Sequence, residues 1–347
     1  MPNTSEPITT TEGNGGTGGT MTAVVQERYG TEPEAVLRTA RLARPAIGPD
    51  EVLVRVRASS VDRGTWHLMA GLPYPVRAVS GPRRPKLPNP GRCVAGVVER
   101  VGSAVTGFAP GDEVYGTAAA AFADYAAARP DRIAPMPAGL TFEEAATVPV
   151  SALTALQAVR DQAKVQECQR VLITGAAGGV GTFAVQLAHT FGAEVTAVAS
   201  TPKLATVRAL GAGHVIDYTR EDFLAGPRRY DAIVDIAGNR TLRDLRRALT
   251  PRGRLIITGG ETDGRWLGGT DRQLRAQLLS PFTAHHLGTF IASEHADGLR
   301  DVTTLINTGG LHPVVDHVRP LAETATAVRH LLEGRVTGKL ALTTTAE

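Results

Sequence analysis

The chain has 347 residues, of which 20% are charged and 42% hydrophobic, proportions that are ordinary for a globular protein of two domains. Its formal net charge of +3 is too small to indicate nucleic-acid binding, and its two cysteines, Cys93 and Cys168, are too few for a disulfide framework. Without an apolar run of membrane-spanning length or a signal-peptide core in residues 1–20, the sequence predicts a cytoplasmic protein that binds neither nucleic acid nor membrane.

Residues 1–20 are rich in Thr, Gly and Pro, which predicts a disordered N-terminal tail. Residues 21–148 carry short β-branched runs at 51–56, 96–101 and 112–115, separated by Gly, Pro and Asp. This pattern is typical of a compact, mostly antiparallel barrel. The proline-rich loop from Leu72 to Gly91 is either a lid over a substrate cleft or an extended connector.

An apolar strand at 170–174 leads into a glycine-rich turn and directly into a helical pattern that ends at Gly192. The turn consists of Gly175, Ala176, Ala177, Gly178, Gly179, Val180 and Gly181. Glycines at 175, 178 and 181 allow a tight turn, a close approach of backbone to a pyrophosphate, and close packing of the helix on the strand. The helix N-terminus then offers N–H groups to the phosphates, so the turn predicts a dinucleotide site.

The surrounding pattern supports this interpretation, because strands and helices alternate through the rest of residues 149–286. Strand patterns occupy 194–199, 214–218, 232–236 and 254–258, and helical patterns occupy 202–210 and 242–249. Such alternation predicts an α/β domain with a doubly wound parallel sheet of the Rossmann type. Thr258 and Gly259 follow one strand and Asn239 follows another, where such folds bind cofactor.

The cofactor preference depends on the residue at the end of the second strand, where an acid would bind the ribose 2′-hydroxyl of NADH. Ser200 occupies this position, with Lys203 close behind and with Tyr218 and Arg220 after the next strand. Hydroxyl and cationic groups suit a 2′-phosphate, so we expect NADPH. The alternative is that Lys203 and Arg220 are solvated surface charges.

Residues 287–347 show a strand pattern at 288–292, a helix at 298–306, an extended segment at 313–318 and a last helix at 322–332. Five segments of the chain, in order, resemble the medium-chain dehydrogenase/reductase superfamily and, within it, the zinc-free quinone oxidoreductases. These segments are Met21–Val25, Pro49–Val56, Gly111–Val114, Gly175–Gly181 and Gly338–Leu340.

The resemblance implies a GroES-like β-barrel catalytic domain at 21–148, a Rossmann NADP-binding domain at 149–286, and a C-terminal segment at 287–347 that completes the catalytic domain. The active site would lie in the cleft between the two domains. Relatives pair the strand at 288–292 across a dimer, and an open apolar edge strand invites association, so we expect a homodimer.

The resemblance also implies site residues. Thr154, within Pro149–Ala155, would lie beside the nicotinamide, and Lys339 is placed among the cofactor-binding residues. Asp62, Trp66, His67 and Thr154 are catalytic candidates, with His67 the candidate proton donor. The alternatives are a hydrogen-bonded barrel histidine and a core tryptophan. Zinc-free relatives often carry a tyrosine where this chain has Gly64, which leaves the proton donor open.

Zinc ligands expected of alcohol dehydrogenases are missing from the sequence. Gly91-Arg92-Cys93 stands where the zinc enzymes have Gly-His-Glu, and the segment Ser59–Arg63 lacks the early ligand cysteine. Adjacent histidines such as His285 and His286 usually point apart, so we expect no metal site. The sequence therefore predicts an NADPH-dependent reductase of a small-molecule quinone or α,β-unsaturated carbonyl. The alternatives are an NADPH-binding protein without catalysis and, third, a zinc-type alcohol dehydrogenase.

Overall fold

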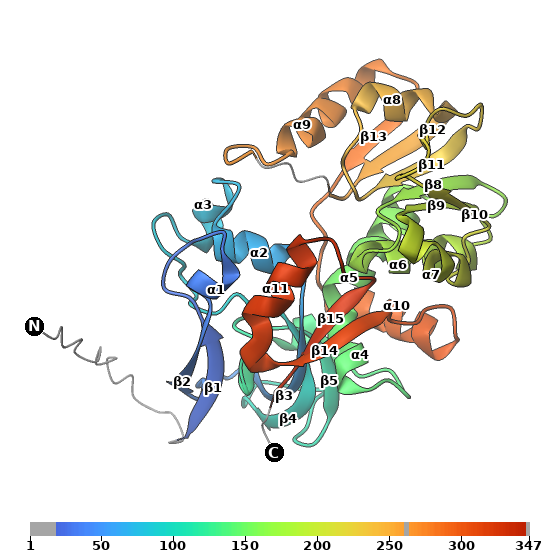
Figure 1. Cartoon of the computed structure of the whole chain (residues 1–347). Helices are drawn as coiled ribbons and strands as arrows, with labels where there is room; N and C mark the ends of the chain where they lie inside the picture. The colour runs from blue at the N-terminus through green and yellow to red at the C-terminus, as the bar shows by residue number, and fades with distance from the viewer. Residues whose placement is uncertain (1–18, 260–263, 345–347) are drawn as a thin grey trace, which may run out of the picture.

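The computed structural model describes residues 19–259 and 264–344, so residues 1–18 of the expected tail lie outside the described part. Two sheets dominate the molecule, one parallel and one largely antiparallel, and each lies in its own domain (Figure 1). A separate ribbon pairs β1 (Thr20–Val25) with β2 (Arg38–Ala43). In the described ranges, the helices are all too short or too polar to cross a bilayer.

The barrel domain is built on a seven-stranded sheet in the order β14-β15-β3-β4-β5-β7, with β6 pairing β3. The strands are β3 (Val52–Val61), β4 (Cys93–Val101), β5 (Glu113–Thr117), β6 (Tyr125–Ala128), β7 (Ile133–Pro135), β14 (Val315–Pro320) and β15 (Lys339–Thr343). Neighbours run antiparallel except β14 and β15. The C-terminal segment thus supplies two strands to a sheet begun by the N-terminal part of the chain.

The second domain holds a six-stranded sheet in the order β10-β9-β8-β11-β12-β13, with every pair parallel. Its strands are β8 (Arg170–Thr174), β9 (Glu194–Ala199), β10 (His214–Asp217), β11 (Tyr230–Asp235), β12 (Leu249–Ile257) and β13 (His286–Thr289). Figure 1 shows helices on both faces: α6 (Gly179–Thr190) and α7 (Leu204–Ala209) on one, α8 (Leu242–Arg247) and α9 (Thr270–Leu279) on the other. The predicted doubly wound sheet is confirmed.

The last parallel strand differs from its predicted position. A strand was expected at 288–292, but β13 covers His286–Thr289 and pairs with β12 from Arg254 to Ile257. Because β12 ends at Ile257, the chain beyond Thr289 has no partner and leaves the sheet. The parallel sheet therefore extends past residue 286, and the segment from Phe290 onward passes toward the barrel domain.

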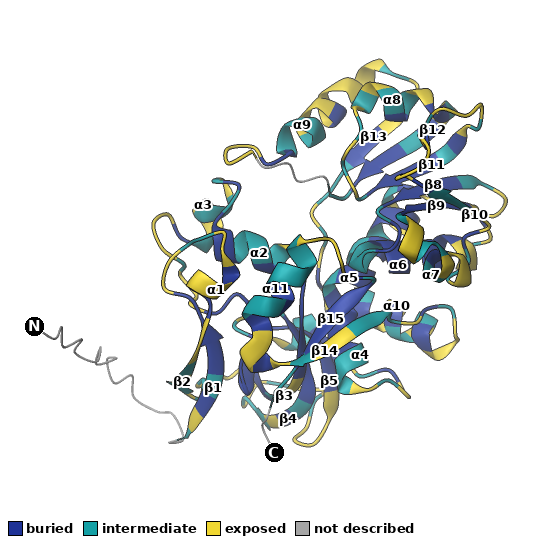
Figure 2. Ribbon diagram, in the orientation of Figure 1, coloured by how far each residue is buried: buried dark blue, intermediate teal, exposed yellow. Residues whose placement is uncertain are grey.

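The remaining helices pack on the barrel or between the domains. They are α1 (Pro33–Val36), α2 (Arg63–Ala70), α3 (Val76–Ser80), α4 (Phe142–Thr147), α5 (Pro149–Leu156), α10 (Ala296–Asn307) and α11 (Thr324–Leu332). Asp62 and Thr65 form a capping box that begins α2, and Gly71 ends the helix at φ +61°. Figure 2 shows buried residues along both sheets and through α6, which is buried from Gly181 to Ala188. Helix α5 packs on α6 and so joins the two domains.

Candidate functional site

The turn between β8 and α6 has the geometry of an anion-binding helix start. Gly175 adopts φ +65°, and a Cβ atom on Gly181 would lie 2.2 Å from the carbonyl oxygen of Gly175. Glycine is thus required at 181, because backbone and not a movable side chain fills that space. Gly178 precedes α6 in an extended conformation and provides no side-chain cap. The N–H groups of the first helical turn remain free of any capping side chain.

Lys339, the first residue of β15, brings a buried cation to this helix start. A Cβ atom on Gly179 would lie 2.7 Å from Cδ of Lys339, and the Gly338 N–H donates to the carbonyl of Ala177 at 2.8 Å. Lys339 is 4% exposed, and its Nζ lacks a hydrogen bond to any described residue. Its nearest carboxylate oxygen is Oδ2 of Asp62 at 4.0 Å. A buried ammonium without a hydrogen-bond acceptor beside uncapped N–H groups fits a bound diphosphate.

The strand ends expected to bind the adenosine half of the cofactor hold hydroxyl, ammonium and carboxylate groups. Ser200 follows β9, and Nζ of Lys203 donates to the carbonyls of Gly334 at 2.8 Å and Val336 at 2.7 Å. Burial lowers the pKa of Lys203. An ammonium has three N–H donors, so one remains for a phosphate. Tyr218, after β10, is half-exposed on the same edge of the sheet.

Sequence reasoning missed the carboxylate of Asp217, which ends β10 near Ser200. Its Oδ1 accepts hydrogen bonds from the backbone N–H and the hydroxyl of Thr219, and its Oδ2 accepts from the Thr201 hydroxyl. These hydrogen bonds, with Thr201 first, and the nearby Arg220 lower the pKa of Asp217. The carboxylate is occupied by the turn that it organises.

Two threonines mark the nicotinamide side of the proposed cofactor site. Thr154, on α5, donates its hydroxyl to the carbonyl of Val150 at 2.7 Å and keeps its lone pairs. Thr258 follows β12, and its buried hydroxyl has no partner among the described residues. Gly259 allows close packing, because a Cβ atom there would lie 2.4 Å from the carbonyl oxygen of Ile236. Asn239 is exposed in the loop that follows β11. These groups fit a carboxamide and a ribose.

Beneath this edge lies a buried network that sequence reasoning also missed. Asp235 ends β11 and is fully buried. It accepts a hydrogen bond from the Thr174 hydroxyl at 2.6 Å and forms an ion pair with Arg272 of α9. Oγ1 of Thr174 accepts in turn from the N–H groups of Ile236 and Ala237. Burial lowers the pKa of Arg272. The network fixes the chain that leads from β11 to Asn239.

Two cavities meet at the boundary between the domains. The interdomain cavity, of about 400 Å³, is lined by Thr154, Thr258 and the segment from Phe290 to His295. The barrel cavity, of about 480 Å³, lies under the proline-rich loop, which contributes residues from Val79 to Gly91. Loop 72–91 is therefore a folded wall of a cavity and includes the short helix α3. Both cavities share Arg92, Arg132 and Glu294.

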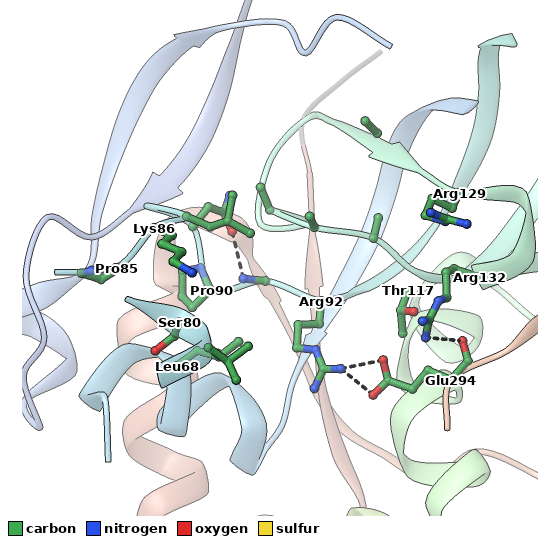
Figure 3. Close-up of a pocket in the computed structure, with 18 of the residues that line it drawn as sticks. Leu68, Ser80, Pro85, Lys86, Pro90, Arg92, Thr117, Arg129, Arg132 and Glu294 are labelled. Carbon is green, nitrogen blue, oxygen red and sulfur yellow. Dashed lines mark hydrogen bonds and ion pairs between the residues drawn. The ribbon is translucent and has the colours of Figure 1, made fainter. Parts of the chain in front are cut away.

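These three shared residues form a hydrogen-bonded partition (Figure 3). Nη2 of Arg92 donates to both carboxylate oxygens of Glu294 at 2.6 Å, and Nη1 of Arg132 donates to the Glu294 carbonyl oxygen at 3.2 Å. Burial alone would lower the pKa of Arg92, but Glu294, Asp62 and Cys93 together raise it. Arg92 precedes β4 and Glu294 follows β13, 202 residues away, so sequence patterns gave no signal for the pairing.

The catalytic candidates from the sequence lie in different places. Thr154 lines the interdomain cavity, and Asp62 contacts Lys339 while its Oδ1 caps α2 through the Thr65 N–H at 2.9 Å. Trp66 packs on the barrel core, and its ring meets that of His67 edge to face at 5.1 Å. Nδ1 of His67 lies 2.6 Å from the carbonyl oxygen of Leu72. Trp66 and His67 are not among the residues that line these two cavities.

The donor set near Asp62 does not suit a metal ion. Cys93 lies 3.9 Å from Oδ2 of Asp62, but the cations Lys339 and Arg92 are its neighbours, and burial and Asp62 raise the pKa of the Cys93 thiol. Across residues 19–259 and 264–344, no three His, Cys, Asp or Glu side chains are grouped closely enough to hold a metal. A catalytic zinc needs about three such ligands.

A second contact between the domains joins the proline-rich loop to the segment before α9. The Tyr74 N–H donates to the Arg265 carbonyl at 2.8 Å, and the rings of Tyr74 and Trp266 meet at 5.1 Å. Tyr74 belongs to the proline-rich loop, and Trp266 precedes α9. We call this contact the clasp.

Comparison with known proteins agrees with this architecture. Residues 48–158 match the alcohol dehydrogenase GroES-like domain, and residues 210–342 match the family model described as zinc-binding dehydrogenase. The chain is 31% identical over 335 residues to a chloroplastic quinone-oxidoreductase homolog of Spinacia oleracea, covering 92% of this chain and 97% of that protein.

Relatives from larger proteins and solved structures extend the comparison. The chain is 34% identical over 321 residues to the spectinabilin polyketide synthase system protein NorB of Streptomyces orinoci, covering 90% of this chain and 14% of that protein. The crystal structure of CurK enoyl reductase superposes with a TM-score of 0.81 at 25% identity, over 93% of this chain and 99% of that one. With its GroES-like barrel, its parallel sheet and these matches, the chain belongs to the medium-chain dehydrogenase/reductase superfamily.

Proposed function

We propose that this protein is a metal-independent, NADPH-dependent reductase that transfers a hydride to a quinone or to the β-carbon of an α,β-unsaturated carbonyl. The observation that carries the proposal is the buried ammonium of Lys339, which faces the uncapped start of α6 without a hydrogen-bond acceptor. Relatives named as a quinone-oxidoreductase homolog and as an enoyl reductase support both acceptor classes.

The residues of this chain divide the work of binding. Lys339 and the first turn of α6 would hold the diphosphate, while Ser200, Lys203 and Tyr218 would contact the 2′-phosphate. Thr154 and Thr258 would orient the carboxamide from the wall of the interdomain cavity. Bound NADPH supplies the hydride.

The protein's contribution to the reaction is then positioning. The acceptor would enter the interdomain cavity, whose wall includes Phe290 and the exposed side chain of Ile291. Metal independence follows from the donor set around Asp62, where two cations stand beside only one carboxylate and one thiol. As part of the same proposal, the open edge of β13 pairs with a second copy to give a homodimer.

Turnover of NADPH tests the proposal. The purified protein is mixed with NADPH and a panel of quinones and α,β-unsaturated ketones, and loss of the NADPH absorbance is followed. We expect turnover that persists after treatment with a chelator, and a Kd for NADPH at least about tenfold lower than for NADH, from one charge-assisted contact to the 2′-phosphate.

Two results would contradict the proposal. Tight NADPH binding without turnover of any acceptor would favour the non-catalytic NADPH-binding protein. Stoichiometric zinc in the purified protein, with loss of activity on its removal, would favour an alcohol dehydrogenase.

A further inference from the structure

Arg92 stands on the wall between the two cavities, and one face of its guanidinium remains free to bind a ligand. Both Glu294 oxygens lie 2.6 Å from the same nitrogen, Nη2. Among the described residues, neither Nε nor Nη1 takes part in these hydrogen bonds, and Nη1 lies 3.4 Å from the position that a Cβ atom on Gly64 would take. Within the described residues, Arg92 therefore keeps donors that Glu294 does not use.

Nη1 of Arg92 packs next to Gly64 of α2. A larger side chain at 64 would meet Nη1 of Arg92 and Oδ1 of Asp62, which lie 3.4 and 3.0 Å from its Cβ position. Arg92 thus lies next to Gly64, the position at which zinc-free relatives often carry a tyrosine. It shares the interdomain cavity with Thr154 and Thr258, the two residues assigned to the nicotinamide.

The guanidinium is also held in place and charged. The Glu294 side chain is 11% exposed and accepts from Arg92, and its backbone carbonyl accepts from Arg132, so both the side chain and the backbone of Glu294 are held. The carboxylates of Glu294 and Asp62 offset the effect of burial on the pKa of Arg92. A fixed, permanently charged donor on the wall of a cavity is the kind of group that stabilises a developing oxyanion.

We propose that Arg92 is a catalytic residue, whose guanidinium binds the carbonyl oxygen of the acceptor and stabilises the negative charge that develops there. This inference rests on the proposed reductase function. The hydride forms the new C–H bond at the β-carbon, the C=C electron pair moves to the bond between the α-carbon and the carbonyl carbon, and the carbonyl pair moves to oxygen. Bound NADPH would supply the hydride and become NADP⁺; the enolate C=C pair would then take a proton from water at the α-carbon while the oxygen pair re-forms the carbonyl bond.

Arg92 keeps its protons throughout, because a guanidinium is too weak an acid to donate one near neutral pH. Glu294 is the positioning residue, since it contacts Arg92 and not the acceptor. The competing explanation is that the pair only joins the barrel to the segment after β13. In that case the loss of Arg92 would lower stability without a selective effect on the chemical step.

The experiment measures single-turnover NADPH oxidation with an α,β-unsaturated ketone in wild type, Arg92→Gln, Arg92→Ala and Glu294→Gln. Arg160→Gln is the control, because Arg160 also pairs with carboxylates but lies outside both cavities. We expect Arg92→Gln to lower the rate about 10²- to 10³-fold, the usual loss for one oxyanion donor, with NADPH affinity retained. Glu294→Gln should lower the rate less.

Chemical rescue separates catalysis from structure. We expect added guanidinium ions, at concentrations below those that unfold the protein, to restore part of the rate of Arg92→Ala and to leave wild type and Arg160→Gln unchanged. Should the alanine variant fail to fold, Arg92→Lys takes its place, with an intermediate rate expected. If wild type is active and Arg92→Gln reacts at the wild-type rate, the role of Arg92 is overturned. The same holds if the rate falls and neither guanidinium nor the lysine substitution restores it. Either result leaves the proposed reductase function standing. A wild type without turnover overturns both proposals.

Discussion

Lys339 shows how a single residue links the cofactor site to the barrel. It begins β15, yet its side chain packs against Gly179 at the start of α6 in the other domain. Burial of an ammonium without hydrogen bonds is costly, and the pair with Asp62 at 4.0 Å offsets this cost only in part. Binding of an anion near Nζ of Lys339 would therefore offset part of the free-energy cost of burying this ammonium.

We expect Lys339→Met to weaken NADPH binding and to change the stability of the protein only slightly. Loss of one charge-assisted contact of about 1.5–3 kcal/mol raises the Kd about ten- to hundredfold. The change in stability is small, because the pair with Asp62 is long and Asp62 keeps the hydrogen bond from the Thr65 N–H and the nearby charge of Arg92. Fluorescence titration and thermal melting measure the two effects, with the exposed Arg335→Met as control. An unchanged Kd would remove Lys339 from the cofactor site.

At the scale of elements, α9 is fastened to the parallel sheet by one buried ion pair. Arg272 and Asp235 have side chains 13% and 0% exposed, whereas Arg275 and Asp271 on the same helix are 72% and 37% exposed. The two pairs have the same chemistry and differ in burial. They form a matched comparison within one helix.

Arg272→Met should destabilise the protein by about 3–5 kcal/mol, because Asp235 is left buried without its cation. Arg275→Met should cost about 0–1 kcal/mol, as is usual for exposed pairs. Urea unfolding gives both values. A double variant, Arg272→Met with Asp235→Asn, should recover much of the loss. Equal effects of the two single substitutions would show that burial of the pair does not matter.

Local patterns predicted most elements of the parallel domain, because each buried strand or helix carries its own periodicity. The glycine turn was also predictable from local sequence, because Gly175 has a positive φ and Gly181 has no room for a side chain. The end of β13 could not be predicted from its own sequence, because it is set by the end of its partner strand β12 at Ile257. The partition between the cavities was not readable either, because Arg92 and Glu294 meet only through the fold.

For the whole molecule, several contacts join the two domains. The clasp does so through Tyr74 and Trp266, and the pair of Arg92 with Glu294 joins the barrel to the segment after β13. The bridge between Gly178 and Gly338 joins the cofactor turn to the barrel sheet. Relative motion of the domains is therefore limited, and unfolding of one is expected to affect the other.

Stability should also depend on pH through His285, which precedes β13. Burial, and then the nearby Arg246, lower the pKa of His285 in the folded protein. As the pH falls, His285 therefore takes up a proton in the unfolded chain before it does so in the folded protein, at about pH 6.5. Protonation then favours unfolding, so the stability present above this pH is lost as the pH falls below it. We expect the melting temperature to fall between about pH 7.5 and 5.5, and His285→Gln to reduce that fall. An identical fall in the variant would contradict this assignment.

The position of Lys339 on β15 affects how a growing chain acquires its ligand. Translation exposes residues 170–289 before Lys339, so every strand of the parallel sheet is present while the barrel still lacks β14 and β15. If NADPH binds as proposed, it stabilises complete chains more than chains that still lack Lys339. A product truncated before residue 339 would lose the Lys339 contact and gain less stability from the cofactor than the full chain does, which leaves it more open to proteolysis.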